Sequence, residues 1–197
     1  MNMQANKPLI PKHTSTSSRI ALAAVLLAVL ALAVLAGSAL AAALVKNGSF
    51  EKDSNGDGIP DNWTPDSLTS SDKRVCNQSH VGACSFKMVG DGDAKFLYQV
   101  IDISGLAGDE FTLKAWTKGK NIVEGGIPTA RAWIQFNPPG YPDGYYYVFI
   151  PPGNTPWTLR QLTVPAPEDY DSVTIGVEVL FTTSGKVWFD KVKLVGS

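Results

Sequence analysis

The densest group of oxygen donors in the sequence lies in the loop between residues 53 and 61. Its side-chain donors stand at alternate positions and are Asp53, Asn55, Asp57 and Asp61. Such donors converge on a hard cation like Ca²⁺, the carbonyl of Ile59 can add a ligand, and Gly58 permits the sharp turn. The twelfth position holds Thr64 rather than Glu, so the loop is not an EF-hand. The spacing predicts a short calcium loop, and a solvated Asp/Asn/Gly turn is the alternative.

The two cysteines form a second group whose spacing bears on chemistry. Cys76 and Cys84 are the only cysteines in the chain, and the segment between them contains Asn, Ser and Gly, which are typical of turns. A lone pair of cysteines in an exported chain usually forms a disulfide. A closed zinc site needs four ligands, and only His80 lies between the cysteines. We therefore predict a Cys76–Cys84 disulfide.

The sequence holds no assembled catalytic group. Its only histidines are His13 and His80, and neither a G-x-S-x-G nor an H-E-x-x-H motif occurs. Glycoside hydrolysis needs only two carboxylates. Most acidic residues, however, lie in expected turns or in the 53–61 loop, and only Glu178 and Asp190 fall within expected strands. We therefore predict that the protein is not an enzyme.

Short strands must position these groups, because no segment after residue 43 has sustained helical periodicity. Residues 110–118 alternate strictly, with Phe111 on the apolar side and Trp116 on the other. Residues 131–136 alternate in the same way and place Trp133 opposite their apolar set. About ten such strands, separated by Gly- and Pro-rich turns, predict an all-β sandwich or barrel.

Residues 1–43 have the organisation of an export signal. A positive, acid-free region precedes an apolar run from residue 20 to residue 35, and small residues follow. This order, with A-x-A cleavage options at residues 39–41 and 41–43, predicts a secretory signal peptide.

An uncleaved signal-anchor helix is the alternative, because residues 20–45 are long enough to span a bilayer. In either case the positive end stays inside and the remainder is exported. We expect a secreted, extracellular or cell-surface protein that contacts a membrane only through an uncleaved N-terminal segment. A single folded domain is expected over residues 44–197, beginning with a short strand at residues 44–47.

The charge of the folded part is slightly negative. Of the 17 Lys and Arg residues, three precede residue 44, whereas all 18 Asp and Glu residues follow residue 50. The folded part therefore carries 14 basic and 18 acidic residues. Because the sequence shows no basic stripe that would neutralise phosphates, we predict that nucleic acid is not a partner.

Both ends of the folded part carry motifs. Residues 47–51 read Asn-Gly-Ser-Phe-Glu, residues 58–63 read Gly-Ile-Pro-Asp-Asn-Trp, and residues 188–192 read Trp-Phe-Asp-Lys-Val. Together they resemble the start and the end of CenC-like carbohydrate-binding modules, and the resemblance covers essentially all of the folded part. It implies a galactose-binding-like jelly-roll β-sandwich of two antiparallel sheets. It also implies a structural Ca²⁺ shared by Glu51 and Asp190, which would clamp the two ends of the domain together.

The same resemblance implies sugar binding, which needs flat aromatic faces for pyranose rings and polar groups for hydroxyls. Trp133 and Trp116 are the aromatic candidates, because each lies opposite the apolar side of its strand. The accompanying candidates are Arg131, Gln135, Tyr147, Glu178 and Gln99. Glu178 is expected to point outward because the apolar residues of its strand are expected to face inward, namely Ile175, Val177, Val179 and Phe181.

These expectations combine into one prediction. The protein is a secreted, non-catalytic domain with structural calcium that binds a polysaccharide or glycan through a sheet face carrying Trp133 and Trp116. A cell-surface structural or adhesive module without sugar specificity is the alternative, because related sandwiches serve both roles. Such a module would keep its leader helix, take a protein partner and cover both tryptophans.

Overall fold

The computed structural model describes residues 44–125 and 130–196. The predicted leader, with its helix and its cleavage site, lies outside the described residues. Within the described part, no helix is long and apolar enough to cross a membrane.

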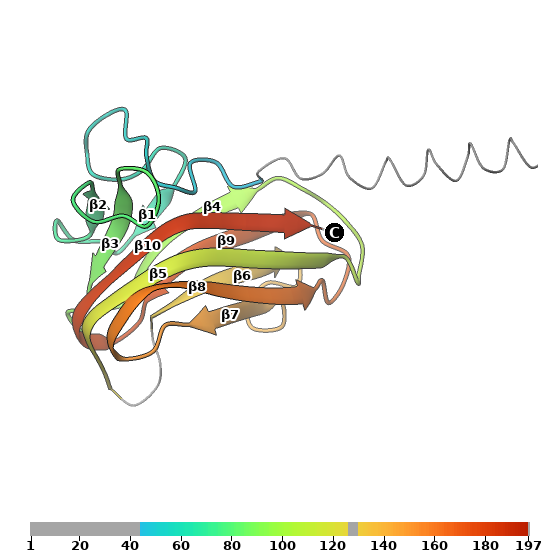
Figure 1. Cartoon of the computed structure of the whole chain (residues 1–197). Coiled ribbons are helices and arrows are strands. Elements are labelled where there is room, and N and C mark those ends of the chain that lie inside the picture. Colours follow the sequence, from blue (N-terminus) through green and yellow to red (C-terminus); the bar gives the residue numbers. More distant parts are fainter. Residues whose placement is uncertain (1–43, 126–129, 197) are drawn as a thin grey trace, which may run out of the picture. The chain divides into compact units, whose positions relative to one another are not determined.

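The described residues form two antiparallel β-sheets, which confirms the prediction of an all-β protein (Figure 1). The strands are β1 (Thr64–Asp66), β2 (Lys73–Val75), β3 (Ser85–Val89), β4 (Lys95–Ile101), β5 (Glu110–Glu124), β6 (Ala130–Asn137), β7 (Tyr145–Phe149), β8 (Gly153–Pro165), β9 (Ser172–Val179) and β10 (Thr182–Gly196). Sheet A has the strand order β1-β4-β9-β6-β7, and sheet B has the order β2-β3-β10-β5-β8. Neighbouring strands in each sheet are therefore mostly distant in sequence.

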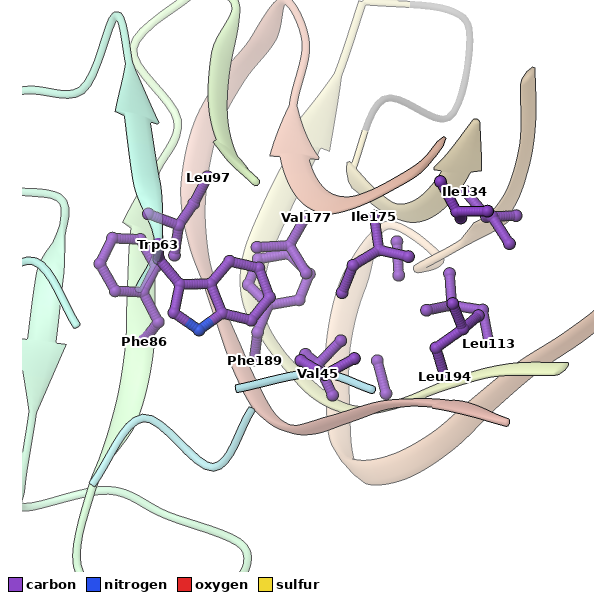
Figure 2. Packing of buried hydrophobic residues seen from close by; sticks show 14 of the residues in the cluster. Val45, Trp63, Phe86, Leu97, Leu113, Ile134, Ile175, Val177, Phe189 and Leu194 are labelled. Carbon is purple, nitrogen blue, oxygen red and sulfur yellow. The ribbon is translucent and has the colours of Figure 1, made fainter. Parts of the chain in front are cut away.

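The core lies between the two sheets and follows from the alternation of side chains. In β5, Leu113 is fully buried, whereas Trp116 on the opposite side is partly exposed. In sheet A, Ile175 and Val177 of β9 are buried on the inner side. Figure 2 shows these aliphatic side chains packed with Phe189 of β10 between the sheets. Burying each such side chain stabilises the fold by about 1.5–3 kcal/mol.

The N-terminal segment joins the sandwich through a side chain rather than as a strand. Residues 44–47 form bends and turns, so the expected first strand is wrong. The amide of Gln99 instead takes the place of a strand partner: it accepts from Lys46 N at 2.8 Å and donates to Lys46 O at 2.9 Å. Gln99 is 6% exposed and lies on the same side of β4 as Leu97. Its expected role on an outer binding face is therefore also wrong.

The last strand lies beside the first folded residues. Val192 N donates to Gly48 O at 2.7 Å. A Cβ atom at Gly48 would lie 2.0 Å from Val192 O, so only glycine allows this approach. The pairing of β10 with β5 shifts register between Asp190 and Lys193 at this point. The two ends of the domain are thus held together by backbone contact.

Candidate functional site

A hollow of about 630 Å³ opens on the outer face of sheet A, a size typical of small-ligand sites. Its aromatic lining comes from β4, β6, β7 and two loops and consists of Phe96, Tyr98, Trp133, Tyr141, Tyr145 and Phe181. Its polar lining consists of Asp66, Arg131, Gln135, Thr174 and Glu178. This set, which we call the sheet A pocket, brings together four of the predicted binding residues: Trp133, Arg131, Gln135 and Glu178.

The floor of the pocket is the indole of Trp133. Trp133 on β6 is directly paired with Gly176 on β9, and a Cβ atom at Gly176 would lie 2.5 Å from two atoms of the indole. The ring can therefore lie over the strand only because this position is glycine. Trp133 is 6% exposed, and its Nε1 has no hydrogen-bond partner in the part of the chain that the structure describes. The ring of Tyr145 lies beside it, with the two centroids 5.2 Å apart.

A buried carboxylate stands next to this aromatic floor. Glu178 is fully buried and forms an ion pair with Arg131. Its Oε1 also accepts a hydrogen bond from the Tyr145 hydroxyl at 2.9 Å. Burial raises the pKa of Glu178 above its ordinary value, and Arg131 and the Tyr145 hydrogen bond oppose that rise. Its Oε2 is buried and has no hydrogen-bond partner among the described residues.

Aromatic rings fix the partners of this carboxylate. The guanidinium of Arg131 lies 4.4 Å from the centroid of Tyr147 and 5.8 Å from that of Tyr145. Burial, followed by the charge of Glu178, raises the pKa of Tyr145 far above its usual range. Tyr145 therefore keeps its proton and remains a donor. Tyr147 supports Arg131 from the side, although it was expected to contact a ligand.

A polar group borders the opposite part of the floor. Gln135 Nε2 donates to Asn137 Oδ1 at 2.6 Å, and Asn137 Nδ2 donates to Thr174 Oγ1 at 3.0 Å. Tyr141, on the β6–β7 loop, is 76% exposed and stands 5.5 Å from Tyr145 between ring centroids. The pocket thus has amide and hydroxyl groups at one side and an exposed aromatic side chain at its entrance.

Nothing in the sequence indicated that Phe96, Tyr98 and Phe181 would line the pocket. Phe96 and Tyr98 lie on β4, whose sequence is too uniformly apolar to reveal which side faces out. The buried positions Lys95 and Leu97 define the inner side. Phe181 was expected to face the core, but it is 65% exposed and lines the pocket. It follows the end of β9 with a φ of 52°, which breaks the alternation.

Trp116 does not share a face with Trp133. Trp116 lies on β5 in sheet B, whereas Trp133 lies on β6 in sheet A, and both point away from the core. The imidazole of His80 stacks on the indole of Trp116, with centroids 3.6 Å apart and an interplanar angle of 17°. The prediction of a single face carrying both tryptophans is therefore wrong, because alternation fixes the side of a strand but not its sheet.

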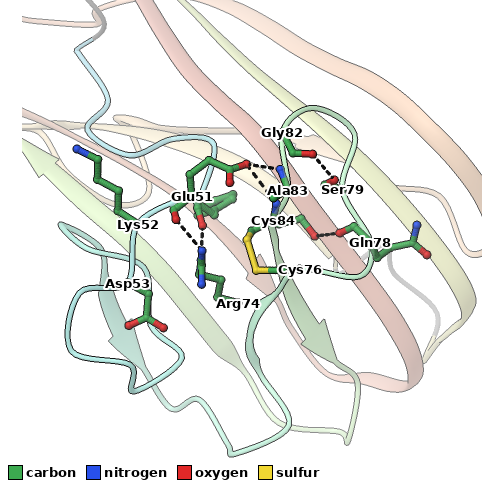
Figure 3. The surroundings of a disulfide bond; sticks show 12 residues. Glu51, Lys52, Asp53, Arg74, Cys76, Gln78, Ser79, Gly82, Ala83 and Cys84 are labelled. Atoms are coloured by element: carbon green, nitrogen blue, oxygen red, sulfur yellow. Dashed lines mark hydrogen bonds between the residues drawn. A yellow bond between two sulfur atoms is a disulfide. The ribbon is translucent and has the colours of Figure 1, made fainter.

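The predicted disulfide joins Cys76 and Cys84 with an S–S distance of 2.04 Å. It closes a loop over residues 76–84, and two carboxylates hold this loop. Glu51 Oε1 accepts from Ala83 N and Cys84 N at 3.0 and 3.2 Å, as Figure 3 shows. Asp190 Oδ2 accepts from His80 N and Val81 N at 2.8 and 2.9 Å. The predicted metal ligands Glu51 and Asp190 thus bind backbone amides of one loop.

The side chains of the 53–61 loop bind their own backbone. Asp53 accepts from Gly56 N and Gly58 N, Asp57 from Ile59 N, and Asp61 from Ser54 N and Oγ. Asn55 Nδ2 donates to Asp57 Oδ2 at 2.8 Å. Among the described residues, no group of three or more His, Cys, Asp or Glu side chains is placed to hold a metal ion. The calcium loop therefore stays a prediction from its spacing.

Comparison with known proteins relates the chain to others through its fold. No protein-family model matches the chain, and no curated protein matches it. The solved family 16 carbohydrate-binding module-2 is 18% identical, with 77% of this chain and 99% of that chain covered and a TM-score of 0.56. A family 61 carbohydrate-binding module in complex with β-1,4-galactotriose is 16% identical, with 79% and 99% covered and a TM-score of 0.54.

Enzymes share the fold as well. The enzymatically active domain of tailspike protein 4 from bacteriophage CBA120 is 21% identical, with a TM-score of 0.58. The match covers 79% of this chain but only 21% of that chain, so this chain spans about a fifth of that protein. At these identities the likeness establishes a β-sandwich fold of the kind found in carbohydrate-binding modules, and function must be argued from the site.

Proposed function

We propose that this protein is a non-catalytic domain that binds a polysaccharide or glycan in the sheet A pocket. The observation that carries the proposal is a buried carboxylate with one unpartnered oxygen, Glu178 Oε2, beside the indole of Trp133. Aromatic faces pack against the C–H surfaces of sugar rings, and a small number of fixed polar groups bind the hydroxyls. The carbohydrate-binding modules of similar fold support this choice of ligand.

Each part of the pocket has a distinct task in this proposal. Trp133 and Tyr145 provide the apolar floor, and Tyr141 covers the ligand from the loop. Glu178 accepts a hydroxyl hydrogen bond, and such bonds to charged groups contribute about 1.5–3 kcal/mol each. Arg131 opposes the rise in the pKa of Glu178 and orients this acceptor through their ion pair. Gln135 offers an amide at the rim.

Hydrolysis requires a second carboxylate. Glycosidases place two carboxyl groups about 5–9.5 Å apart across the scissile bond. In the pocket the other acid is Asp66 on β1, and the cross-strand row runs from Asp66 through Phe96 to Glu178. Phe96 therefore lies between the two acidic residues. The carboxylate of Glu178 is already engaged in an ion pair with Arg131, which suits a binding role. We therefore assign the pocket a binding role.

The proposal includes export and structural calcium. A disulfide is stable in an oxidising compartment, which agrees with the predicted secretory leader. For calcium, Glu51 and Asp190 are the residues that would hold the ion. Asp190 is fully buried and its Oδ1 has no partner in the described part of the chain, so one carboxylate oxygen is open to a cation. The cation would supply the compensating charge that a buried carboxylate needs.

Glycan binding by paired variants tests the proposed function. We would measure affinity electrophoresis and calorimetry against a panel of neutral polysaccharides for the protein and for Trp133→Phe and Trp116→Phe. Binding that is lost in Trp133→Phe and kept in Trp116→Phe supports the sheet A pocket. Binding lost only in Trp116→Phe would move the site to sheet B. No binding to any glycan would favour the structural or adhesive module instead.

A further inference from the structure

The outer face of sheet B gathers half of the positive charge of the folded part. Seven of its 14 basic residues point outward from four neighbouring strands, and we call this set the lysine face. Its members are Lys73, Lys87, Lys114, Lys118, Lys120, Lys186 and Lys193. They are spread over 121 positions of sequence, so only the strand order of the sheet brings them together.

The lysines stand directly opposite one another across the strands. Lys73 pairs with Lys87, Lys120 with Lys186, and Lys114 with Lys193. Directly opposed residues in an antiparallel pair have Cβ atoms about 4.5–5.5 Å apart, and like charges at this spacing destabilise a sheet. Burial lowers the pKa of Lys87, and the charges of Lys186 and Lys73 add to that effect. The arrangement therefore destabilises the sheet, and a bound anionic partner would relieve the repulsion between the lysines.

Within the described residues, no member of the lysine face belongs to a recorded ion pair, although the charge of Asp72 acts on Lys87 and opposes the lowering of its pKa. The ion pairs that the structure records join Lys95 to Asp72 and Asp91, and Arg131 to Glu178. The carboxylate of Asp190 lies on the same side of sheet B, but it is fully buried and accepts from the 76–84 loop. The sequence led us to expect no basic stripe, and the opposed lysines of sheet B show that this expectation is wrong. The net charge of the folded part is negative, yet one of its faces is positively charged.

The aromatic residues among these lysines are covered. Trp188 lies between Lys87 and Lys118 in the cross-strand row and is 8% exposed. Trp116 is covered by the ring of His80. Single-stranded nucleic acids bind through exposed aromatic stacking platforms, and membrane-surface elements insert apolar side chains. A face of partly or fully exposed lysines over covered rings instead suits a hydrated chain that carries regularly spaced anionic groups.

We propose that the lysine face binds an acidic polysaccharide, one whose sugar units carry carboxylate or sulfate groups. The ammonium groups contact these anions as point charges. Binding would be driven by the release of counterions from the polymer and would weaken as salt rises. This site lies on the opposite outer face from the sheet A pocket, and it does not depend on the function proposed for that pocket.

A ligand pair that differs only in charge tests the proposal. Polygalacturonate is compared with its fully methyl-esterified form, by calorimetry on the whole protein. We expect binding of the first and none of the second. If four lysines contact the polymer at roughly −0.7 per contact, a fourfold rise in salt lowers the binding constant about 50-fold. Equal binding of both forms would overturn the proposal.

Two double variants with the same net charge provide the matched control. Lys120→Gln with Lys186→Gln removes two exposed, directly opposed members of the lysine face, and Lys46→Gln with Lys52→Gln removes two exposed lysines outside it. We expect the first to lower polygalacturonate affinity about tenfold or more and to reduce the salt slope by roughly 1.4, at about 0.7 for each lysine, and the second to leave both unchanged. Equal losses in both variants would show a net-charge effect and refute the site.

Competing ligands and the pocket variant complete the test. Trp133→Phe should keep polygalacturonate binding, while the lysine variant should keep any neutral-glycan binding, so the two proposals fail separately. Duplex DNA or vesicles of anionic lipid that bind more tightly than polygalacturonate would replace the acidic polysaccharide with another class of partner. Salt-sensitive self-association seen by sedimentation, with no polymer binding, would assign the face to a second copy of the chain.

Discussion

The contact between Gly176 and Trp133 can be tested by adding a single methyl group. At a strand position with negative φ, replacing glycine by alanine ordinarily stabilises a protein by about 0.4–1 kcal/mol, because the unfolded chain loses freedom. Here the new Cβ atom would lie 2.5 Å from Cε2 and Cζ2 of Trp133 and 2.7 Å from its Nε1. Favourable carbon contacts need about 3.5–4.0 Å. The indole must therefore move by about 1 Å or more.

The magnitude follows from how closely the ring is held. Trp133 is 6% exposed and packs against Tyr145, so it has little room to shift. Overpacking a well-packed site typically costs about 1–3 kcal/mol. After subtracting the gain expected for alanine, Gly176→Ala should destabilise the fold by about 1–2 kcal/mol. The same shift would disturb the floor of the pocket and weaken glycan binding.

A double-mutant cycle separates this contact from a general effect of alanine. The free energy of unfolding in urea would be measured for the protein, Gly176→Ala, Trp133→Leu and the double variant. We expect Gly176→Ala to be neutral or stabilising when Trp133 is already leucine, which gives a coupling energy of about 1–3 kcal/mol. If Gly176→Ala stabilises both backgrounds equally, the indole does not rest on this glycine and our description of the floor is wrong.

Three further predictions concern other parts of the structure. Because burial raises the pKa of Glu178, the folded state holds its proton more tightly than the unfolded state. The protein should therefore lose stability relative to Glu178→Gln as pH rises from the ordinary glutamate pKa through the raised one, and a flat difference across pH would contradict this. If calcium binds at Glu51 and Asp190, a chelator should lower the melting midpoint, because it removes up to about 2.7 kcal/mol of unfolding free energy for a hundredfold excess of ion over Kd. Asp190→Asn should lose that sensitivity while Asp57→Asn keeps it. Reducing the disulfide, whose cysteines are 8 positions apart, should cost about 2.5 kcal/mol in thermal denaturation. The paired Cys76→Ser, Cys84→Ser variant should not respond to reductant, and an equal response would point to another target.

The side on which a residue points could be predicted from local sequence. Trp133, Arg131 and Gln135 do face outward together, because alternation along one strand needs no knowledge of its neighbours. Glu178 is likewise outward. Its ion pair with Arg131 could not be predicted, because it depends on β6 lying beside β9 across 47 positions of sequence. Contacts of this kind are set by strand order, which the local pattern does not encode.

Strand order also explains the main errors. Trp116 and Trp133 follow the same local rule on strands that are consecutive in sequence, yet these strands belong to different sheets. The lysines of sheet B look evenly scattered along the chain and meet only in the folded sheet. Lys95 is the opposite case: although it is charged, it is fully buried, and Asp72 binds its ammonium group at 3.0 Å.

The loop over residues 76–84 has a mechanical consequence. Glu51, near the start of the folded part, and Asp190, in the last strand, both bind backbone amides of this one loop. Asp190 binds the amides of His80 and Val81, and Glu51 binds those of Ala83 and Cys84, so only Gly82 separates the two attachments and the chain between them cannot lengthen appreciably. Tension applied across the two ends of the domain would pass through the two carboxylates in series, while the two hydrogen bonds at each carboxylate share the load. Removing either carboxylate would therefore lower the force at which the ends separate.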